Sequence, residues 1–385
     1  MTAIAKRLEG VNEYYFSRKL KEIEGLNRQG KEIINLGIGS PDLPPHPDVI
    51  KTLQDECSKP NVHAYQSYKG AKVLRDGMAQ WYSKWYQVTL DPETEILPLI
   101  GSKEGIMHTC MTYLNEGDLA WVPDPGYPTY ASAVTLAGAQ PVTYNLTAEN
   151  GYLPVIGELE QALTQNGKRI KLMLLNYPHM PTGTLPRQQV FEKLVAFARQ
   201  HQILLVHDNP YSFILNDHPR SILSVEGAKE VAIELNSLSK SHNMAGWRVG
   251  MITGAEDRIN EILKFKSNMD SGMFLPVQLA AAKALTLDED WFAGLNEVYK
   301  RRKALACEIL DTVGCAYTKD QSGMFVWAKI PPAFANCFDL SDHILYEKNI
   351  FITPGGIFGQ NGLQYVRISL CKPEAELNRV LERLR

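Results

Sequence analysis

A lysine flanked by hydroxyl residues is the strongest candidate for chemistry in this chain. Lys240 lies within NSLSKSHNMAGWR, residues 236–248, directly after the apolar run 231–235. Burial lowers the pKa of an amine, so part of a buried lysine is neutral and nucleophilic near neutral pH. Such an amine suits a Schiff base with a phosphorylated aldehyde, and Ser237 and Arg248 would bind the phosphate.

Two further loops have residue types that a phosphorylated ring compound would need. Gly101-Ser102-Lys103 follows an apolar run and opens a helix, where free backbone N–H groups and the helix dipole favour a phosphate. An ordinary strand-to-helix turn explains this loop equally well. Tyr127 follows the next run, in DPGYPTY, and its ring could stack on a flat cofactor. Spacing alone favours a core tyrosine at a turn.

Two charged residues lie at or within apolar, strand-like segments. Asp208 follows the run 203–206, and a buried carboxylate there needs a cationic partner, for which a protonated pyridine nitrogen would serve. The alternative is a helix cap. Arg367 lies in YVRIS and could clamp a carboxylate with two parallel N–H···O bonds. A structural ion pair or a snorkelling residue on an edge strand is the alternative for Arg367.

The candidate residues follow short apolar runs that alternate with amphipathic segments. The runs lack polar alternation and lie at residues 95–100, 119–122, 140–144, 170–175, 203–206, 231–235 and 249–253. This pattern predicts βα units and a mostly parallel sheet that is covered on both faces. Ligands of open α/β sheets bind at the carboxyl edge of the strands, which is where the candidate residues would meet.

The remaining segments predict a second, smaller α+β domain. We expect a long helix at 276–310, strands at 324–330, 350–353 and 364–370, and helices at 341–348 and from 374. The N-terminal segment is assigned to the same domain, because a chain terminus in such folds often docks across a domain boundary. The predicted large domain is therefore 46–285, and the small domain comprises 1–45 and 286–385.

Composition excludes several kinds of partner. The chain has 385 residues, 44% hydrophobic and 22% charged, with a net charge of −3, which is an ordinary globular composition. No basic cluster interleaved with aromatic residues indicates nucleic-acid binding, and no apolar run approaches the roughly 20 residues of a membrane span. The start of the chain lacks the apolar region of a signal peptide, and the cysteines form no CxxC pair. We therefore expect a cytoplasmic protein without disulfides or a metal site.

Taken together, these segments resemble the class I/II pyridoxal-phosphate aminotransferases of fold type I. The resemblance runs from LGIGSPDLPPHP, residues 36–47, to YVRISL, residues 365–370. SLSKSHNMAGWRVG is its most specific motif, GSKEG and PGYPTY support it, and the alanine, aspartate and LL-diaminopimelate aminotransferases form the most similar subgroup. The resemblance implies pyridoxal 5′-phosphate as cofactor and an α/β fold, with a mostly parallel seven-stranded sheet and a smaller α+β domain. It also implies amino-group transfer between an amino acid and a 2-oxo acid by a ping-pong mechanism.

The resemblance also implies a role for each candidate residue. Lys240 would hold the cofactor as a Schiff base and then move a proton from the substrate Cα. Asp208 would pair with the pyridinium nitrogen, and Arg367 would bind the substrate carboxylate. Other contacts would come from Tyr211 at the ring hydroxyl, Tyr127 on the ring, the backbone of Gly39 at the carboxylate, and a phosphate-binding set of Ser237, Arg248, the backbone of Ser102 and Lys103, and Tyr65 of the partner subunit. The last contact implies a homodimer with shared active sites.

Two positions depart from the family pattern. Met180 replaces an asparagine whose amide donates a hydrogen bond to the ring hydroxyl oxygen of the cofactor. Methionine cannot donate. The bound cofactor should therefore keep its proton to higher pH, unless His179 or Asn176 supplies the donor. His242 replaces a common tyrosine, and we expect a packed core histidine with at most an indirect effect.

Two other functions stay open. The same fold and cofactor serve β-C–S lyases and decarboxylases, and a lyase would release ammonia without needing an amino acceptor. A non-catalytic cofactor-binding sensor is the second alternative. Against the sensor, no helix-turn-helix segment precedes the domain, and Lys240, Asp208 and Arg367 are all present. A nicotinamide-dependent Rossmann enzyme is excluded, because LGIGSPD lacks the third glycine of GxGxxG and the helix after it.

Of all the features of the reaction, the sequence indicates the side chain of the substrate least. Aspartate-specific enzymes often have a second arginine near a segment that corresponds to residues 267–273, and this segment has none. The absence disfavours a strict dicarboxylate enzyme, unless Arg7, Arg18 or Lys21 supplies the charge. Glutamate and 2-oxoglutarate are the expected exchange pair by family habit.

Overall fold

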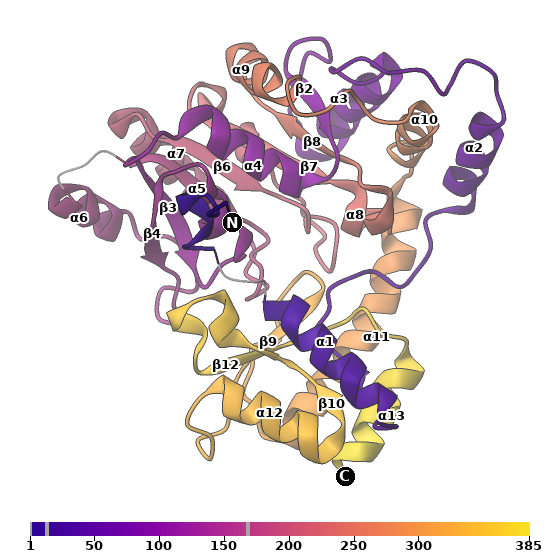
Figure 1. Ribbon diagram of the computed structural model, residues 1–385, viewed down its shortest axis with the longest axis vertical. Coiled ribbons are helices and arrows are strands. Elements are labelled where there is room, and N and C mark those ends of the chain that lie inside the picture. Colours follow the sequence, from indigo (N-terminus) through magenta and orange to yellow (C-terminus); the bar gives the residue numbers. More distant parts are fainter. Residues whose placement is uncertain (1, 12–14, 167–169) are drawn as a thin grey trace.

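A seven-stranded sheet forms the framework of the larger part of the molecule, in the upper half of Figure 1. The structure is a computed structural model that describes residues 2–11, 15–166 and 170–385. In spatial order the strands are β2 (Ile96–Leu99), β8 (Gly250–Thr253), β7 (Ala232–Ser237), β6 (Leu204–Asp208), β5 (Ile170–Asn176), β3 (Leu119–Asp124) and β4 (Gln140–Asn145). Only β8 runs antiparallel to its neighbours. The sheet is thus mostly parallel, as the apolar runs predict.

Helices cover both faces of this sheet. On one face lie α4 (Ser102–Tyr113), α5 (Thr129–Leu136) and α9 (Glu256–Lys266). On the other side lie α2 (Pro47–Cys57), α3 (Lys72–Tyr86), α6 (Ile156–Asn166), α7 (Gln188–His201) and α10 (Leu275–Ala284). Neighbouring residues of β5 illustrate the result, because Leu174 is buried in the first core and Met173 in the second. Burial on both faces explains why the strands lack polar alternation.

Consecutive parallel strands end in polar residues at one edge of the sheet. β5 ends at Asn176, β6 at Asp208 and β7 at Ser237. The pairing register places Asn176 directly opposite Asp208. Because parallel strands share one direction, these side chains are brought together although more than 60 residues separate the first from the last.

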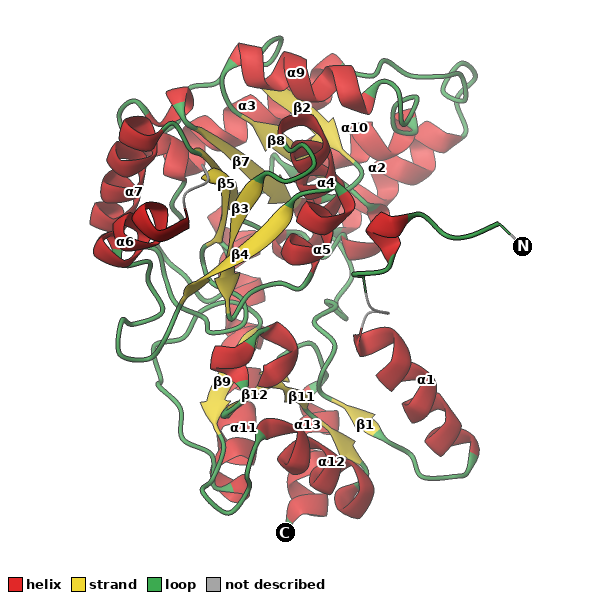
Figure 2. Cartoon of the chain, turned by 60° about the vertical axis from the view of Figure 1, so that its left-hand side comes forward, coloured by secondary structure: helices red, strands yellow, loops and turns green. Residues whose placement is uncertain are grey.

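Two small sheets form the lower part of the molecule (Figure 2). One contains β11 (Thr353–Pro354), β12 (Tyr365–Ser369) and β9 (Phe325–Lys329), all antiparallel, and the other pairs β1 (Ile34–Asn35) with β10 (Ile350–Phe351). The helices of this part are α1 (Tyr15–Arg28), α12 (Cys337–Lys348) and α13 (Glu374–Leu384). Pairing of β1 with β10 joins the N-terminal segment to the C-terminal part. Domain boundaries at residues 46 and 285 stay a prediction.

The single helix expected at 276–310 is two helices, so that prediction is wrong. α10 ends at Ala284, and α11 (Glu289–Val313) begins after Asp288, whose backbone is extended. Glu289 and Asp290 occupy the first turn of α11. Carboxylates stabilise the positive end of a helix dipole, which favours a new helix start at this position.

Helix α11 is 25 residues long and extends from the large sheet to the small sheets (Figure 1). Near its start, Trp291 Nε1 donates to the carbonyl oxygen of Ser241 at 2.9 Å. Farther along, the guanidinium of Arg302 binds Asp42 with Nη1–Oδ1 and Nη2–Oδ2 distances of 2.6 and 2.8 Å. Asp42 lies in the loop after β1, so α11 is bonded both to the segment of Lys240 and to the N-terminal part of the chain.

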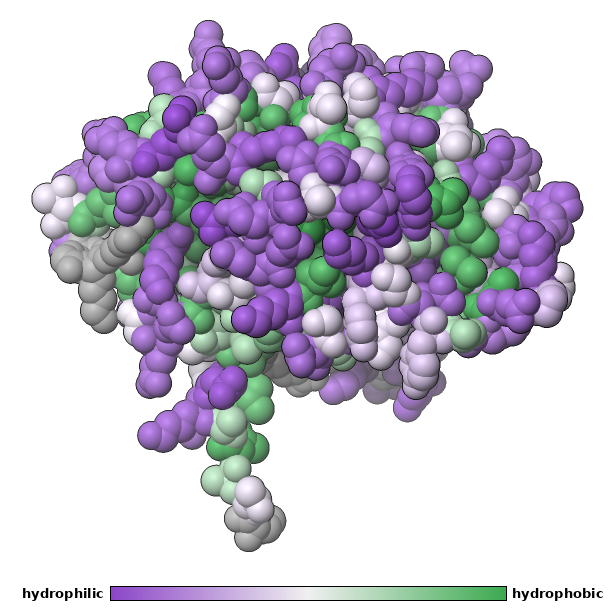
Figure 3. Space-filling model, turned by 90° about the horizontal axis from the view of Figure 1, so that it is seen from above, coloured by the Kyte–Doolittle hydropathy of each residue, from purple (hydrophilic) through white to green (hydrophobic). Residues whose placement is uncertain are grey.

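The face of the molecule seen from above is mainly hydrophilic, with smaller apolar areas (Figure 3). None of the described helices combines the length and the apolar character that crossing a bilayer requires. The residues before the short helix η1 (Lys6–Leu8) project from the body as an arm (Figures 2 and 3). Ile4 on this arm is 67% exposed.

Candidate active site

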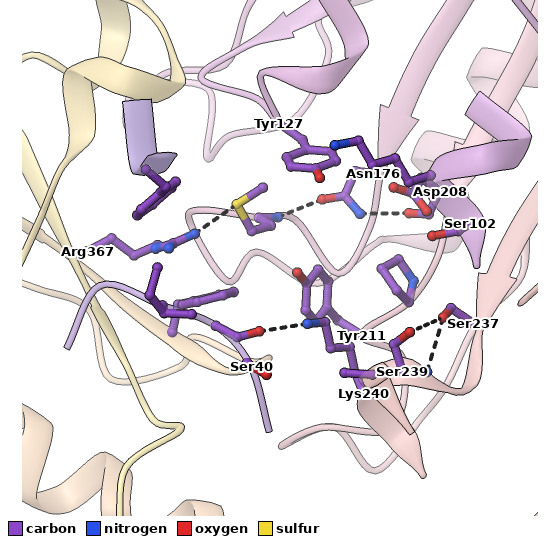
Figure 4. A pocket seen from close by; sticks show the side chains of 18 of the residues that line it. Ser40, Ser102, Tyr127, Asn176, Asp208, Tyr211, Ser237, Ser239, Lys240 and Arg367 are labelled. Atoms are coloured by element: carbon purple, nitrogen blue, oxygen red, sulfur yellow. Dashed lines mark hydrogen bonds between the residues drawn. The ribbon is translucent and has the colours of Figure 1, made fainter. Parts of the chain in front are cut away.

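A cavity of about 650 Å³ is lined by the carboxyl edge of the large sheet and by segments of the lower part. It brings together every residue predicted for the site except Tyr65: the lining includes Gly39, Ser102, Lys103, Tyr127, Asp208, Tyr211, Ser237, Lys240, Arg248 and Arg367 (Figure 4). Tyr65 lies outside the lining, and its side chain is 92% exposed. That position leaves it available to a second copy of the chain.

Lys240 is positioned by a short helix that follows the end of β7. This helix, α8 (Leu238–Ser241), begins after Ser237, whose Oγ accepts a hydrogen bond from Ser239 N at 3.1 Å. Ser237 and Ser239, which precede Lys240, therefore shape the turn as well as the cavity. Lys240 Nζ donates to the carbonyl oxygen of Gly39 at 2.6 Å, which joins the large-sheet edge to the loop after β1.

The surroundings of Lys240 favour its neutral amine. Burial lowers the pKa of Lys240, and the positive charges of Arg367 and Arg248 lower it further. A lowered pKa leaves a larger fraction of the amine unprotonated near neutral pH, which is the state that a nucleophile or a base requires.

Asp208 has one satisfied and one unsatisfied oxygen. Its Oδ2 accepts from the hydroxyl of Tyr130 at 2.8 Å, whereas its Oδ1 is buried without a hydrogen-bond partner among the described residues. Burial raises the pKa of Asp208 to about 6. A buried orphan oxygen on a carboxylate indicates a site for an N–H donor that bears positive charge. This arrangement fits a protonated pyridine ring.

Sequence reasoning missed Tyr130 although it lies three residues after Tyr127. Thr129 begins α5, and Tyr127 lies two residues before it. The two rings meet edge to face with centroids 5.6 Å apart, so Tyr130 holds Asp208 while Tyr127 faces the cavity. The spacing of two tyrosines at i and i+3 was the signal that could have found it.

The start of α4 and the Arg248 guanidinium lie against each other at one end of the cavity. Gly101 has a φ of 82°, and a Cβ at that position would overlap the guanidinium of Arg248. Arg248 is held by the carbonyl oxygens of Ala245 and Ile100, at 3.0 and 3.3 Å. Glu104 accepts from the backbone N–H of Ile100 and so fixes the turn before the helix. Helix N–H groups beside a guanidinium form a site for an anion such as a phosphate.

Arg367 lies at the other end, buried between aromatic rings. Its guanidinium carbon is 3.8 Å from the ring centroid of Phe325 and 4.7 Å from that of Phe358. Nη2 donates to the carbonyl oxygen of Gly37 at 2.7 Å, and Nη1 lies 3.3 Å from the sulfur of Met180. Ring contacts stabilise a guanidinium cation, and the planar fork of an arginine suits a carboxylate ligand.

Met180 faces Arg367, and Asn176, one of the two possible replacement donors, already makes hydrogen bonds of its own. Asn176 lines the cavity, but its Nδ2 donates to the backbone oxygen of Asp208 at 2.7 Å and its Oδ1 accepts from Met180 N at 2.8 Å (Figure 4). His179 lies outside the lining and shares a hydrogen bond with Thr182 Oγ1 at 2.8 Å. Met180 therefore takes part in the site through its contact with Arg367.

His242 is a packed core residue, as the sequence analysis expects. It is buried against Phe292 and Trp81, with ring centroids 5.6 and 6.2 Å away, and its Nδ1 bonds Ser241 Oγ. Burial lowers the pKa of His242 to about 3, so its ring is neutral. The three N-terminal cations considered as a second charge, Arg7, Arg18 and Lys21, are absent from the described lining.

An apolar wall is the feature of the cavity that sequence reasoning missed most completely. Phe16 and Leu20 of α1, Ile38, and the rings of Phe325 and Phe358 all line it. Phe16 and Leu20 are four residues apart on one helix, which places them on the same face. That spacing indicates a buried helix face but does not reveal what the face covers.

The donor set fits a phosphorylated pyridine aldehyde and an amino acid. One cavity contains four groups that such ligands need. They are the amine of Lys240, whose pKa is lowered, the carboxylate of Asp208, which has one buried oxygen without a partner among the described residues, the anion site beside Arg248, and the guanidinium of Arg367 between aromatic rings. Among the described residues, no group of three or more histidine, cysteine, aspartate or glutamate side chains could hold a metal ion.

Comparisons with known proteins agree with this chemistry. Residues 31–384 match the family described as aminotransferase class I and II. The chain is 39% identical to the LL-diaminopimelate aminotransferase of Halothermothrix orenii, over 99% of this chain and 97% of that protein. It is 38% identical to that of Dehalococcoides mccartyi, over 99% and 98%. Among solved structures, substrate-bound BacF of Bacillus subtilis superposes with a TM-score of 0.94 at 35% identity, over 100% of this chain and 97% of that chain.

Proposed function

The chain belongs to the aminotransferase class I and II family and is an aminotransferase, and from this premise we propose that Lys240, Asp208 and Arg367 perform its reaction. The reaction moves an amino group between an amino acid and a 2-oxo acid. The main support for the proposal is that all three residues line one cavity. In it, the pKa of Lys240 is lowered, one buried oxygen of Asp208 has no partner among the described residues, and Arg367 lies between aromatic rings.

We assign pyridoxal 5′-phosphate, the cofactor of this family, to this cavity. Lys240 would hold it covalently through Nζ, and Asp208 Oδ1 would accept from its ring nitrogen. The remaining groups would be Tyr211 at the ring hydroxyl, Tyr127 on the ring face, and Ser237, Arg248 and the backbone of Ser102 and Lys103 at the phosphate. When bound, the cofactor supplies an electron sink for the negative charge that develops at the substrate Cα.

The residues of the chain would bind, orient and transfer a proton. Arg367 would bind the α-carboxylate of the amino acid, and this binding would fix the direction of the Cα–H bond. Once the substrate amine has displaced it, Lys240 Nζ is the base within reach of that hydrogen. Burial, together with the nearby positive charges, lowers the pKa of Lys240 and so keeps the released amine able to accept the proton.

We further propose a homodimer in which Tyr65 of the partner subunit completes the phosphate site. Exposure supports this arrangement, because Tyr65 is 92% exposed and Ile4 on the projecting arm is 67% exposed. Exposed apolar and aromatic side chains on different segments are typical of a surface that another chain covers.

An absorbance spectrum of the purified protein with pyridoxal 5′-phosphate tests the proposed function. Alanine, aspartate, glutamate and LL-diaminopimelate, the amino acid that names the two relatives, would be added one at a time. We expect a visible cofactor band that an amino acid converts to the pyridoxamine form and that a 2-oxo acid restores. The Lys240→Ala variant should not form the band.

Other outcomes would separate the alternatives. Release of ammonia or another product without the pyridoxamine form would favour a lyase. A band that no amino acid alters would favour a sensor. The absence of any band, with the same behaviour in Lys240→Ala, would contradict the role of Lys240.

A further inference from the structure

We propose that the amino acid accepted by this site has an uncharged, apolar side chain, and that α1 provides the wall that recognises it. The inference rests on the aminotransferase function proposed above and concerns the identity of its substrate. Leucine and aspartate form the informative pair, because the terminal isopropyl group of leucine has nearly the shape of the terminal carboxylate of aspartate.

Charged side chains in the described lining have other tasks in the proposed function. Arg248 lies at the phosphate end, and Lys240 and Asp208 belong to the ring of the cofactor. Lys103 lies at the start of α4, at the phosphate end, where its backbone takes part. Arg367 is used by the α-carboxylate of the substrate. Asp208 is the only carboxylate among the described lining residues, so a diamino dicarboxylic acid would find no acidic partner there for its second ammonium group.

Several apolar side chains lie around Arg367, whose Nη2 also donates to the carbonyl oxygen of Gly37. Phe16 and Leu20 of α1, Ile38 and Phe358 line this end of the cavity. The ring centroids of Phe16 and Phe358 lie 5.8 and 4.7 Å from the guanidinium carbon of Arg367. A side chain that extends from a substrate held by Arg367 therefore meets rings and aliphatic groups. Among the described lining residues, a carboxylate at that place would find no second cation, whereas an isopropyl group would gain contacts.

Helix α1 is fixed by contacts that do not depend on a ligand. Lys19 Nζ lies 3.2 Å from Asp342 Oδ1 on α12, and Tyr346 of the same helix donates to Glu22. The wall is therefore formed before a substrate binds. Leu20 is nevertheless 42% exposed, which leaves apolar surface for a ligand to cover.

Two carboxylic acids that lack an amino group, and so cannot undergo transfer, can measure how strongly the apolar wall prefers an apolar side chain over a carboxylate. 4-Methylpentanoate and succinate are leucine and aspartate without the amino group, so their dissociation constants report binding and not transfer. The constants can be obtained with the cofactor-loaded protein by calorimetry. We expect 4-methylpentanoate to bind at least about tenfold more tightly, and leucine to exceed aspartate by a similar factor in kcat/KM for release of the 2-oxo acid.

A variant of α1 tests whether the helix provides the selectivity. Leu20→Arg introduces a cation into the wall, and it should lower the preference for 4-methylpentanoate over succinate by at least about tenfold. Leu185→Arg is the matched control, because Leu185 is also an exposed leucine and lies outside the described lining. An unchanged preference in Leu20→Arg would contradict the role of α1.

The outcomes distinguish this inference from the function on which it rests. Equal or tighter binding of succinate, with faster reaction of aspartate, would overturn the apolar preference while the aminotransferase function stands. If Lys103→Met then abolishes that dicarboxylate preference, Lys103 is the second cation. If no amino acid converts the bound cofactor at all, the proposed function itself fails.

Discussion

The carboxylate of Asp208 has one oxygen bonded to Tyr130 and one buried oxygen without a partner among the described residues. Burial raises the pKa of Asp208 from 3.8 to about 6 in the cofactor-free protein. A folded-state pKa above the unfolded value gives stability that is fully present below the unfolded pKa and is lost as pH rises through the folded pKa. Asp208 should therefore destabilise the empty protein above about pH 6.

The Asp208→Asn variant tests this charge effect. Two pKa units correspond to about 3 kcal/mol. Without cofactor, the neutral variant should be more stable than the parent by up to that amount near pH 8, and the difference should vanish near pH 4. Urea unfolding of the cofactor-free proteins at both pH values measures it. With cofactor the order should reverse, because asparagine cannot pair with a pyridinium. A stability difference that is independent of pH would contradict the prediction.

A second prediction about a single side chain concerns Met180. Its sulfur contacts Arg367, and it offers no donor to the ring oxygen of a bound cofactor. Met180→Asn would restore the donor of the family pattern and stabilise the deprotonated cofactor. We therefore expect the pH midpoint of the visible cofactor band to fall in Met180→Asn. Met180→Leu, which keeps the volume and adds no donor, should leave the midpoint unchanged. Equal midpoints in all three proteins would contradict the prediction.

Among the elements, the loop after β1 depends on α11. Arg302 is buried and binds Asp42 through two bonds, and the same loop contains Gly39, which accepts from Lys240. Asp42→Ala leaves a buried cation without its partner and should lower the free energy of unfolding by roughly 3 kcal/mol. Urea unfolding measures the loss.

Two controls accompany the Asp42 variant. Glu297→Ala breaks an exposed pair with Lys300 on the same helix and should change stability little. The double variant Asp42→Leu with Arg302→Met replaces the buried pair by apolar groups and should recover most of the loss. A loss in the double variant as large as in Asp42→Ala would show that the bond is not the cause.

The sequence predicts the strands of the large sheet well because all of them except the edge strand β4 are buried on both faces. All seven apolar runs overlap strands, and the polar ends Asn176, Asp208 and Ser237 follow from the strand ends. The break between α10 and α11 was missed, because helical residues continue through it and only the acids after Leu287 mark the new start. Local patterns thus identify elements that tertiary packing does not override.

The candidate site was predictable where residues have distinctive chemistry. Lys240, Arg248 and Asp208 stand in motifs, and the cavity joins them. Phe16 and Leu20 carry no such signature. Their place beside Arg367 depends on how α1 packs against a part of the chain more than 300 residues away, which no local pattern contains.

For the whole molecule, the proposed dimer predicts that subunits can complement each other. Lys240→Ala lacks the amine, and Tyr65→Ala lacks a phosphate contact for the neighbouring site. In a mixed dimer, one site combines Lys240 from one chain with Tyr65 from the other and is intact. Equal mixing after mild unfolding and refolding should restore about a quarter of the native sites, since half of the dimers are mixed.

Titration of tightly bound cofactor measures the restored sites. Each variant refolded alone is the control and should bind cofactor weakly. If the mixture binds no more cofactor than the average of the two variants, Tyr65 does not act across an interface. Sedimentation of the parent protein gives the oligomeric state independently.

Helix α11 is a long element that connects the two parts of the molecule, so a small rotation at one end would displace the other end. Its 25 residues make a rod about 37 Å long, with its start bonded to the segment of Lys240 through Trp291 and its far part beneath the small sheets. A rod of that length amplifies rotation, so a tilt of about 5° at Trp291 moves the far end by about 3 Å. A displacement of that size, close to the width of a methyl group, would open or narrow the cavity between the two parts while every strand stays intact.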